Sequence, residues 1–142
     1  MKRRHFLSGS LVMSAASAFG KESSKPLLLG YDNFAVRAMD WKANELIDYA
    51  EELKVDTVFI TDLDAFQSLD EKHLVGIRKY ADDKGIKIYL GTWSVCPTSV
   101  SFKDKWGTAE EHLRLGLRSA KALGSPVIRV VLGNGSCLLY TS

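Results

Sequence analysis

The sequence is poor in cysteine, and the few it has form no recognisable pattern. Its 142 residues include only Cys96 and Cys137, which stand far apart in no CxxC or histidine-spaced arrangement. A zinc knuckle and a disulfide framework are therefore not indicated. Cys96 has no activating histidine or lysine near it in the sequence, which argues against a catalytic thiol.

A cluster of basic side chains is also missing outside the first four residues. The formal net charge is +2, and Lys2, Arg3 and Arg4 contribute three positive charges, so the rest of the chain carries +2 − 3 = −1. A nucleic-acid-binding protein needs a basic stripe that neutralises phosphates, and we expect no nucleic-acid partner. With 46% hydrophobic and 25% charged residues, the composition is that of one globular domain, which excludes a disordered or collagen-like chain.

No apolar run is long enough to predict a stable membrane anchor. Residues 1–20 read MKRRHFLSGSLVMSAASAFG, with a cationic start and a modestly apolar run of about 14 residues. A membrane-spanning helix needs about 20 predominantly apolar residues. The small-residue triplet Ala16-Ser17-Ala18 suits signal peptidase. These features predict that residues 1–20 are a signal peptide that is removed.

The segment Arg3-Arg4-His5-Phe6-Leu7 resembles the twin-arginine export motif. This resemblance implies recognition by the twin-arginine export machinery and an exported protein, located in the periplasm or elsewhere outside the cytoplasm. Twin-arginine signals address proteins that fold before export. Two other interpretations stay open: a general secretion signal that happens to contain two arginines, and a cytosolic tail.

From Pro26 onward, short apolar runs alternate with amphipathic stretches, the pattern of successive βα units around a parallel sheet. Strands are predicted at residues 27–31, 57–61, 86–90 and 127–132, with a long loop at residues 91–107. The first helix is predicted at residues 40–54. Capping-box patterns begin two more helices at Ser68 and Thr108, and Gly85 and Gly124 end them.

The last predicted helix has an apolar face that we expect to be buried. His73 and His112 fall on predicted helices, not at strand ends, and are expected to be surface residues of an outer ring. The residues of that apolar face are Leu113, Gly116, Leu117, Ala120 and Leu123.

The predicted strands start 30, 29 and 41 residues apart, as in βαβ architecture. A (β/α)8 barrel typically needs about 250 residues. We therefore predict an α/β fold in which residues 26–134 form the first four βα units of a (β/α)8 TIM barrel, truncated after the fourth strand. Residues 136–142, SCLLYTS, resemble translated sequencing-adapter read-through and are expected to be a non-native tail. A genuine loop is the alternative.

Three segments carry a resemblance to a known family: LIDYAEELKVDTVFI, IRKYADDKGIKIYLGTW and WGTAEEHLRLGLRSAKALGSPVIRVVLG. They resemble the sugar phosphate isomerase/epimerase family, the xylose isomerase-like TIM barrels. The resemblance implies a parent enzyme that isomerises or epimerises sugars by proton transfer, with a divalent metal held by later strands. Those strands lie outside this sequence, so no metal ligand or catalytic residue is assigned, and residues 1–142 alone are expected to be inactive.

Polar residues at the ends of the predicted strands are the candidate binding residues, because barrels of this kind build their sites there. Aspartates would bind the hydroxyls of a small-molecule sugar or polyol, and Trp93 would stack against a sugar face. The other interpretation is that all of them are ordinary loop caps. The polar residues at these ends are Tyr31, Asp32, Asn33, Thr61, Asp62, Asp64, Thr92, Trp93 and Asn134. Of these, the candidate substrate-binding residues are Tyr31, Asp32, Asp62, Thr92, Trp93 and Asn134.

Three other functions were weighed. A non-catalytic exported carbohydrate-binding or scaffold protein would keep the barrel without its metal site. Residues 62–66, DLDAF, resemble the DxDx(T/V) motif of haloacid-dehalogenase-type phosphatases, but Phe66 replaces the Thr or Val and the motif follows the second strand. In the endonuclease branch of the resembled family, the third and fourth strands end in histidine ligands. Here they end in Thr92-Trp93 and Gly133-Asn134, which argues against a nuclease.

Overall fold

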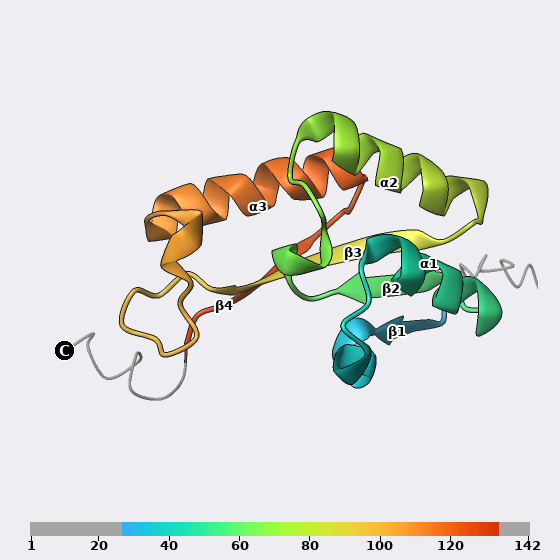
Figure 1. Ribbon diagram of the computed structural model, residues 1–142, viewed down its shortest axis with the longest axis horizontal. Helices are drawn as coiled ribbons and strands as arrows, with labels where there is room; N and C mark the ends of the chain where they lie inside the picture. The colour runs from blue at the N-terminus through green and yellow to red at the C-terminus, as the bar shows by residue number, and fades with distance from the viewer. Residues whose placement is uncertain (1–26, 134–142) are drawn as a thin grey trace, which may run out of the picture.

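The computed structural model describes residues 27–133, which form an α/β structure around one parallel sheet (Figure 1). The strands are β1 (Gly30–Asp32), β2 (Thr57–Ile60), β3 (Lys87–Ser94) and β4 (Ile128–Val131). The α-helices are α1 (Ala43–Glu52), α2 (Glu71–Asp83) and α3 (Ala109–Leu123), and three 3-10 helices are η1 (Asn33–Met39), η2 (Leu63–Ala65) and η3 (Asp104–Trp106). The predictions for residues 1–20, Asn134 and residues 136–142 lie outside the described residues.

The four strands are hydrogen-bonded in the order β1-β2-β3-β4, and every neighbouring pair is parallel. Each α-helix follows one strand and precedes the next, so the chain makes successive βα units, as the sequence predicted. Within residues 27–133, no helix is both long and apolar enough to cross a membrane.

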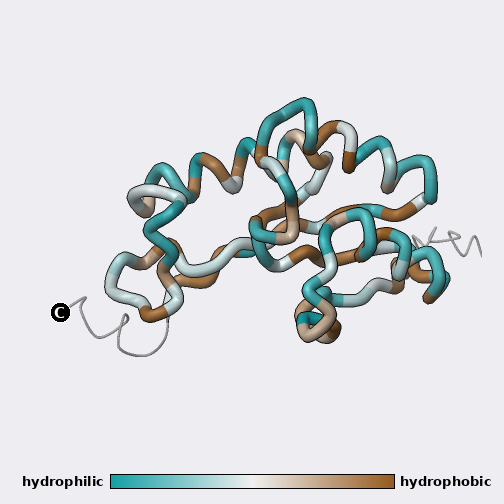
Figure 2. Tube along the Cα trace, in the orientation of Figure 1, coloured by the Kyte–Doolittle hydropathy of each residue, from teal (hydrophilic) through white to brown (hydrophobic). Residues whose placement is uncertain are grey.

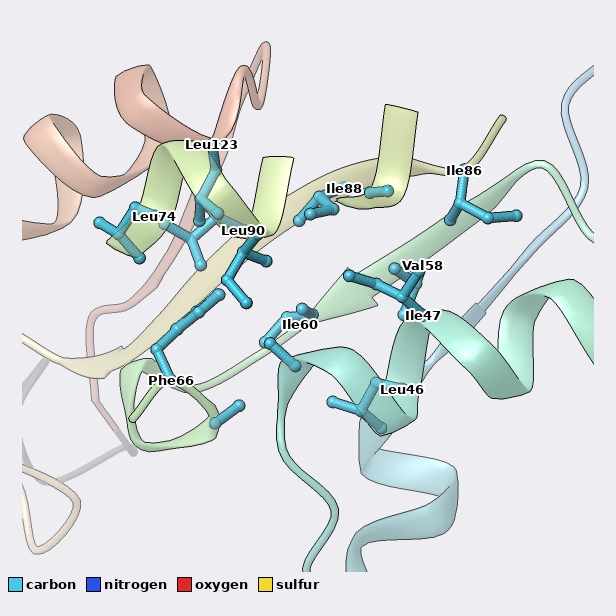
Figure 3. Packing of buried hydrophobic residues seen from close by; sticks show 14 of the residues in the cluster. Leu46, Ile47, Val58, Ile60, Phe66, Leu74, Ile86, Ile88, Leu90 and Leu123 are labelled. Carbon is cyan, nitrogen blue, oxygen red and sulfur yellow. The ribbon is translucent and has the colours of Figure 1, made fainter. Parts of the chain in front are cut away.

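The hydrophobic core lies between the helices and one face of the sheet (Figure 3). Alternate residues of a strand point to the same face, so Val58 and Ile60 of β2 point with Ile88 and Leu90 of β3 toward the helices. These four side chains are at most 4% exposed. They pack with the apolar faces of the helices, including Leu46, Ile47, Leu74 and Leu123.

The opposite face of the sheet carries a mixture of aromatic and polar side chains. Phe59, Tyr89 and Trp93 are half-buried on it, and the Arg129 guanidinium lies 4.9 Å from the centre of the Phe59 ring. Gly91 lies between them, where a Cβ atom would meet the Phe59 ring and the Arg129 side chain. Figure 2 shows that the apolar stretches of the chain concentrate in the strands and on the inner sides of the helices.

The ends of α3 follow the sequence closely. Thr108 is its N-cap, with the Thr108 hydroxyl accepting from Glu111 N and the Glu111 carboxylate accepting from Thr108 N. This reciprocal box satisfies two backbone donors that the first turn leaves free. Gly124 ends the helix with φ of 71°, the left-handed conformation that glycine adopts at low cost. Gly85 takes a similar conformation after α2, as predicted.

Several predictions about element starts and ends are wrong. The first strand begins at Gly30 and not at residue 27, and the first α-helix spans Ala43–Glu52 instead of residues 40–54. Ser68 does not cap α2, which begins at Glu71 after Asp70. Instead the Ser68 hydroxyl donates to the Asp70 carboxylate and accepts from Asp70 N, so the two residues satisfy each other ahead of the helix. β3 continues four residues beyond Leu90 because β4 pairs with it as far as Ser94. Residues 33–39, predicted as neither strand nor helix, form η1.

The predicted buried face of α3 is wrong at two positions. Gly116, Ala120 and Leu123 are buried, but Leu113 and Leu117 are 37% and 51% exposed. The helix turns its polar residues His112 and Ser119 inward in their place.

Candidate functional site

Polar side chains from the ends of β1, β2 and β3 meet at the carboxyl edge of the sheet, together with the loop that follows β3. We call this group the carboxyl-edge cluster. In parallel α/β structures this edge is where ligands bind, because loops that face the same way gather there. The cluster consists of Asn33, Thr61, Asp62, Asp64, Trp93 and Lys103.

Asn33 ties the end of β1 to the end of β2. Its side-chain oxygen accepts hydrogen bonds from Thr61 N at 2.9 Å and from the Thr61 hydroxyl at 2.8 Å. Both contacts are part-buried, which holds the amide in one orientation. The Asn33 side-chain nitrogen makes no hydrogen bond within residues 27–133, so it remains a donor at this edge.

Asp62 is the centre of the cluster. Its Oδ1 accepts from Asp64 N at 3.1 Å, which caps η2, and its Oδ2 accepts from the Trp93 indole Nε1 and from Lys103 Nζ, the latter at 2.8 Å. Lys103 Nζ also lies 2.6 Å from Asp64 Oδ2 and 5.1 Å from the centre of the Trp93 ring. The Asp62 side chain is 19% exposed, so the pair is partly shielded from water.

Two lysines influence the charge state of Asp64. Partial burial raises the pKa of Asp64, but hydrogen bonds from Lys103 and Lys105 outweigh it and hold that pKa below its ordinary value. Burial lowers the pKa of Lys103, and its bonds to Asp62 and Asp64 outweigh that effect and raise it. The network therefore favours an ionised Asp64 carboxylate and a protonated Lys103 ammonium.

A hollow of about 180 Å³ opens beside the cluster, between η1 and the ends of β2 and β3. Its lining includes Asn33, Thr61, Asp62 and Trp93, and Arg37 and Lys42 add positive charge. A water molecule takes up about 30 Å³ of the liquid, so the hollow holds a small polar molecule or part of a larger one. Its walls offer hydroxyl, amide, carboxylate and indole groups.

The predicted binding residues have different environments. Asp62 and Trp93 are brought into direct contact, whereas Asp32 caps η1 by accepting from Phe34 N at 2.8 Å. Tyr31 points toward the helices, where its hydroxyl donates to Leu46 O at 2.7 Å. Burial there raises the pKa of Tyr31 to about 12. Thr92 is fully buried against α3, and Asn134 lies outside the described residues.

His112 was predicted to be a surface residue, and this is wrong. The side chain is 0% exposed, and its Nε2 lies 2.6 Å from the Thr92 hydroxyl. The reason is that α3 presents this position to β3, where Thr92 supplies a polar partner in the sheet. His73 is half-buried on α2.

Lys103 was not foreseen as part of the site. It lies 41 positions after Asp62 in a loop without periodicity, and no local pattern identifies such a residue. Arg37, which lines the hollow from η1, was missed for the same reason, since η1 itself was not predicted. The loop lysines pair with the aspartates after β2 only because the parallel pairing of β2 and β3 brings the two loops together.

The described residues contain no group of three or more His, Cys, Asp or Glu side chains that could hold a metal ion. Asp62 and Asp64 come closest to such a group, but lysine ammonium groups already occupy their oxygens. No metal ligand is therefore assigned among residues 27–133, and the family resemblance places the ligands of the divalent metal on later strands.

The chain was compared with known proteins at the level of sequence families and of structures. Comparisons with protein-family models, with curated proteins and with solved structures find no match.

Proposed function

We propose that this chain is part of an exported protein that binds a small sugar or polyol at the carboxyl-edge cluster. The observation that supports the proposal is the contact between the Asp62 carboxylate and the Trp93 indole at the rim of a polar hollow. Carboxylates accept hydrogen bonds from sugar hydroxyls, and an aromatic ring offers an apolar surface to the C–H face of a sugar.

The cluster keeps groups available for such a ligand. Asp62 accepts three hydrogen bonds within residues 27–133, and a carboxylate has about four acceptor positions. The Asn33 amide nitrogen adds a donor on the same wall of the hollow. An acceptor and a donor that line the same hollow match the hydroxyls of a sugar or polyol, which both donate and accept.

We further propose that the four βα units belong to a (β/α)8 barrel of the sugar phosphate isomerase/epimerase type. In support, all four strands are parallel and sequential, and the helices cover one face. Parallel sheets are normally covered on both faces, and in a barrel the second face lines the interior. Phe59, Tyr89 and Trp93 would then point into that interior.

The parent activity proposed from the resemblance is a metal-dependent aldose–ketose isomerase or epimerase, with a non-catalytic carbohydrate-binding protein as the alternative. Because no metal ligand or catalytic residue is assigned among the described residues, no reaction step is assigned to them. The proposal for these residues is therefore binding and orientation of the sugar.

Sugar binding is tested by titrating aldoses, ketoses, polyols and sugar phosphates into the purified full chain, with isothermal calorimetry as the readout. We expect saturable binding of at least one class, and a loss of about tenfold in affinity in Asp62→Asn and in Trp93→Leu. Trp106→Phe is the matched control, because this tryptophan does not line the hollow. Absence of saturable binding, or equal affinity in Asp62→Asn, would overturn the proposal.

Export is tested separately, with the predicted signal peptide. A reporter that fluoresces only when folded before export is fused to residues 1–26 and localised by cell fractionation. We expect the reporter outside the cytoplasm, and Arg3→Lys with Arg4→Lys to retain it inside, because the paired arginines are what the pathway reads. Export of the double variant at the original level would contradict the twin-arginine assignment.

A further inference from the structure

A second hollow lies between α2 and α3, and it shares no residue with the carboxyl-edge cluster. Its volume is about 750 Å³, within the range of about 300–1,000 Å³ that is usual for small-molecule sites. We call it the α2–α3 groove. Aliphatic side chains form about half of its wall, and charged or polar side chains form the rest. The aliphatic residues are Leu69, Leu74, Val75, Leu115 and Ala122.

A buried hydroxyl without a partner lies in this aliphatic wall. Ser119 is 1% exposed and lines the groove, and its Oγ has no hydrogen-bond partner within residues 27–133. A buried hydroxyl that forms no hydrogen bond is unfavourable, and proteins usually pair such groups with protein, water or ligand atoms. An acceptor atom that reached Ser119 Oγ from the groove would give this hydroxyl a partner.

Three cationic side chains line the same groove as this hydroxyl. Arg118 and Lys121 flank Ser119 on α3, and neither forms an ion pair with any described residue. Arg78 reaches the groove from α2, where it has only a 3.5 Å contact with Asp82 on its own helix. Guanidinium, ammonium and hydroxyl groups all donate hydrogen bonds, so together they favour an anionic acceptor.

Acidic side chains limit how many anionic groups the groove can accept. Asp70 and Glu71 line it at the start of α2, two turns before Arg78. A second negative charge near them would be repelled. The groove therefore matches a molecule with one anionic end and an apolar remainder.

From these observations we infer that the α2–α3 groove binds an amphiphile with a single anionic head group and an aliphatic chain. The head group accepts from Ser119, Arg118 and Lys121, and the chain lies along Leu74 and Leu115. A carboxylate and a phosphate share this chemistry. This site is independent of the proposed sugar site, so either can fail alone.

The test titrates octanoate, octyl phosphate and 1-octanol, each below its micellar concentration, into the 15N-labelled full chain. Amide shifts of α2 and α3 are followed by NMR. We expect saturable shifts with at least one anion, and affinity for 1-octanol lower by about tenfold or more. The stronger of the two anions identifies the head group. Equal binding of 1-octanol, or shifts that do not saturate, would overturn the inference.

Variants separate a specific site from general hydrophobic binding. Arg118→Gln combined with Lys121→Gln is expected to weaken anion binding by about tenfold while 1-octanol is unaffected, and Ser119→Ala by a few-fold. Arg114→Gln is the matched control, because Arg114 is an exposed cation of the same helix that lies outside the groove and pairs with Glu110. Circular dichroism checks that each variant is folded. Unchanged anion affinity in the folded double variant would rule the site out.

Discussion

The Thr92 hydroxyl lies 2.6 Å from His112 Nε2, and both side chains are 0% exposed. The contact joins the middle of β3 to the first turns of α3 across the core. His112 Nδ1 has no hydrogen-bond partner within the described residues, so Thr92 is the ring's one polar contact there. A single hydrogen bond thus compensates for burying a polar ring between a strand and its helix.

Thr92→Val is expected to destabilise the protein by about 1–3 kcal/mol, because the isosteric change leaves His112 Nε2 buried and unpaired. Urea unfolding at neutral pH measures the loss. Thr92→Ser keeps the hydroxyl and serves as the control, with a smaller effect from its missing methyl group. Equal destabilisation by the two variants would show that packing, not the hydrogen bond, matters at this position.

Stability is expected to depend on pH through His112. Burial lowers the pKa of His112, and the positive charge of Lys103 adds to this while Asp62 opposes it. The folded protein therefore favours the neutral ring more than the unfolded chain does. This contribution to stability is complete at pH values above the unfolded pKa of about 6.5. It is lost as the pH falls through the lowered pKa of the folded protein.

The measurement is the free energy of unfolding in urea between pH 8 and pH 5, compared with His112→Gln, which cannot titrate. The wild type is expected to lose stability on acidification by more than the variant does. An NMR titration of the His112 ring gives a direct check. A folded pKa at or above the ordinary histidine value would refute the argument.

Two helical glycines are expected to respond to alanine in opposite directions. A Cβ on Gly76 of α2 would meet nothing within 4 Å, whereas one on Gly116 of α3 would lie 2.6 Å from Ile128 Cδ1. Gly76→Ala should stabilise the protein by about 0.5–1 kcal/mol through helix propensity. Gly116→Ala should cost about 1 kcal/mol net, since Ile128 must move.

Thermal and urea unfolding measure the stability of the two variants. Each variant is the control for the other, because both gain the same helix propensity from alanine. Stabilisation by Gly116→Ala as large as that by Gly76→Ala would mean that Ile128 moves aside at no cost.

Local signals in the sequence predicted much of the fold. The Thr108 capping box and the glycines after α2 and α3 act within one helical turn, so neighbouring residues suffice to recognise them. His112 and Leu117 were predicted wrongly because the inner face of α3 is decided by β3, where Thr92 offers a hydroxyl. That information is not local to the helix.

The same distinction holds for the candidate site. Asp62 and Trp93 follow or end apolar strands, and strand ends can be recognised from the sequence. Lys103 and Asn33 act through partners that lie 41 and 28 positions away. Their roles depend on the parallel register of the sheet, which brings the ends of separate βα units together.

The carboxyl-edge cluster gives a final prediction, on the titration of Asp64. Hydrogen bonds from Lys103 and Lys105 hold the pKa of Asp64 low against the opposing effect of burial. Lys103→Met removes one of these bonds and keeps most of the side-chain volume, so the pKa of Asp64 should rise. A 13C NMR titration of the aspartate carboxyl groups measures it in both proteins.

The same substitution should change how stability depends on pH. A lowered carboxyl pKa stabilises the fold at pH values above the unfolded pKa, and this stabilisation is lost on acidification. Lys103→Met should therefore weaken the dependence of the free energy of unfolding on pH below about pH 4. Lys79→Met is the control, because Lys79 pairs with Asp83 at the surface of α2, far along the chain from the cluster. An unchanged Asp64 titration in Lys103→Met would contradict the argument and would show that Lys103 does not lower the pKa of Asp64.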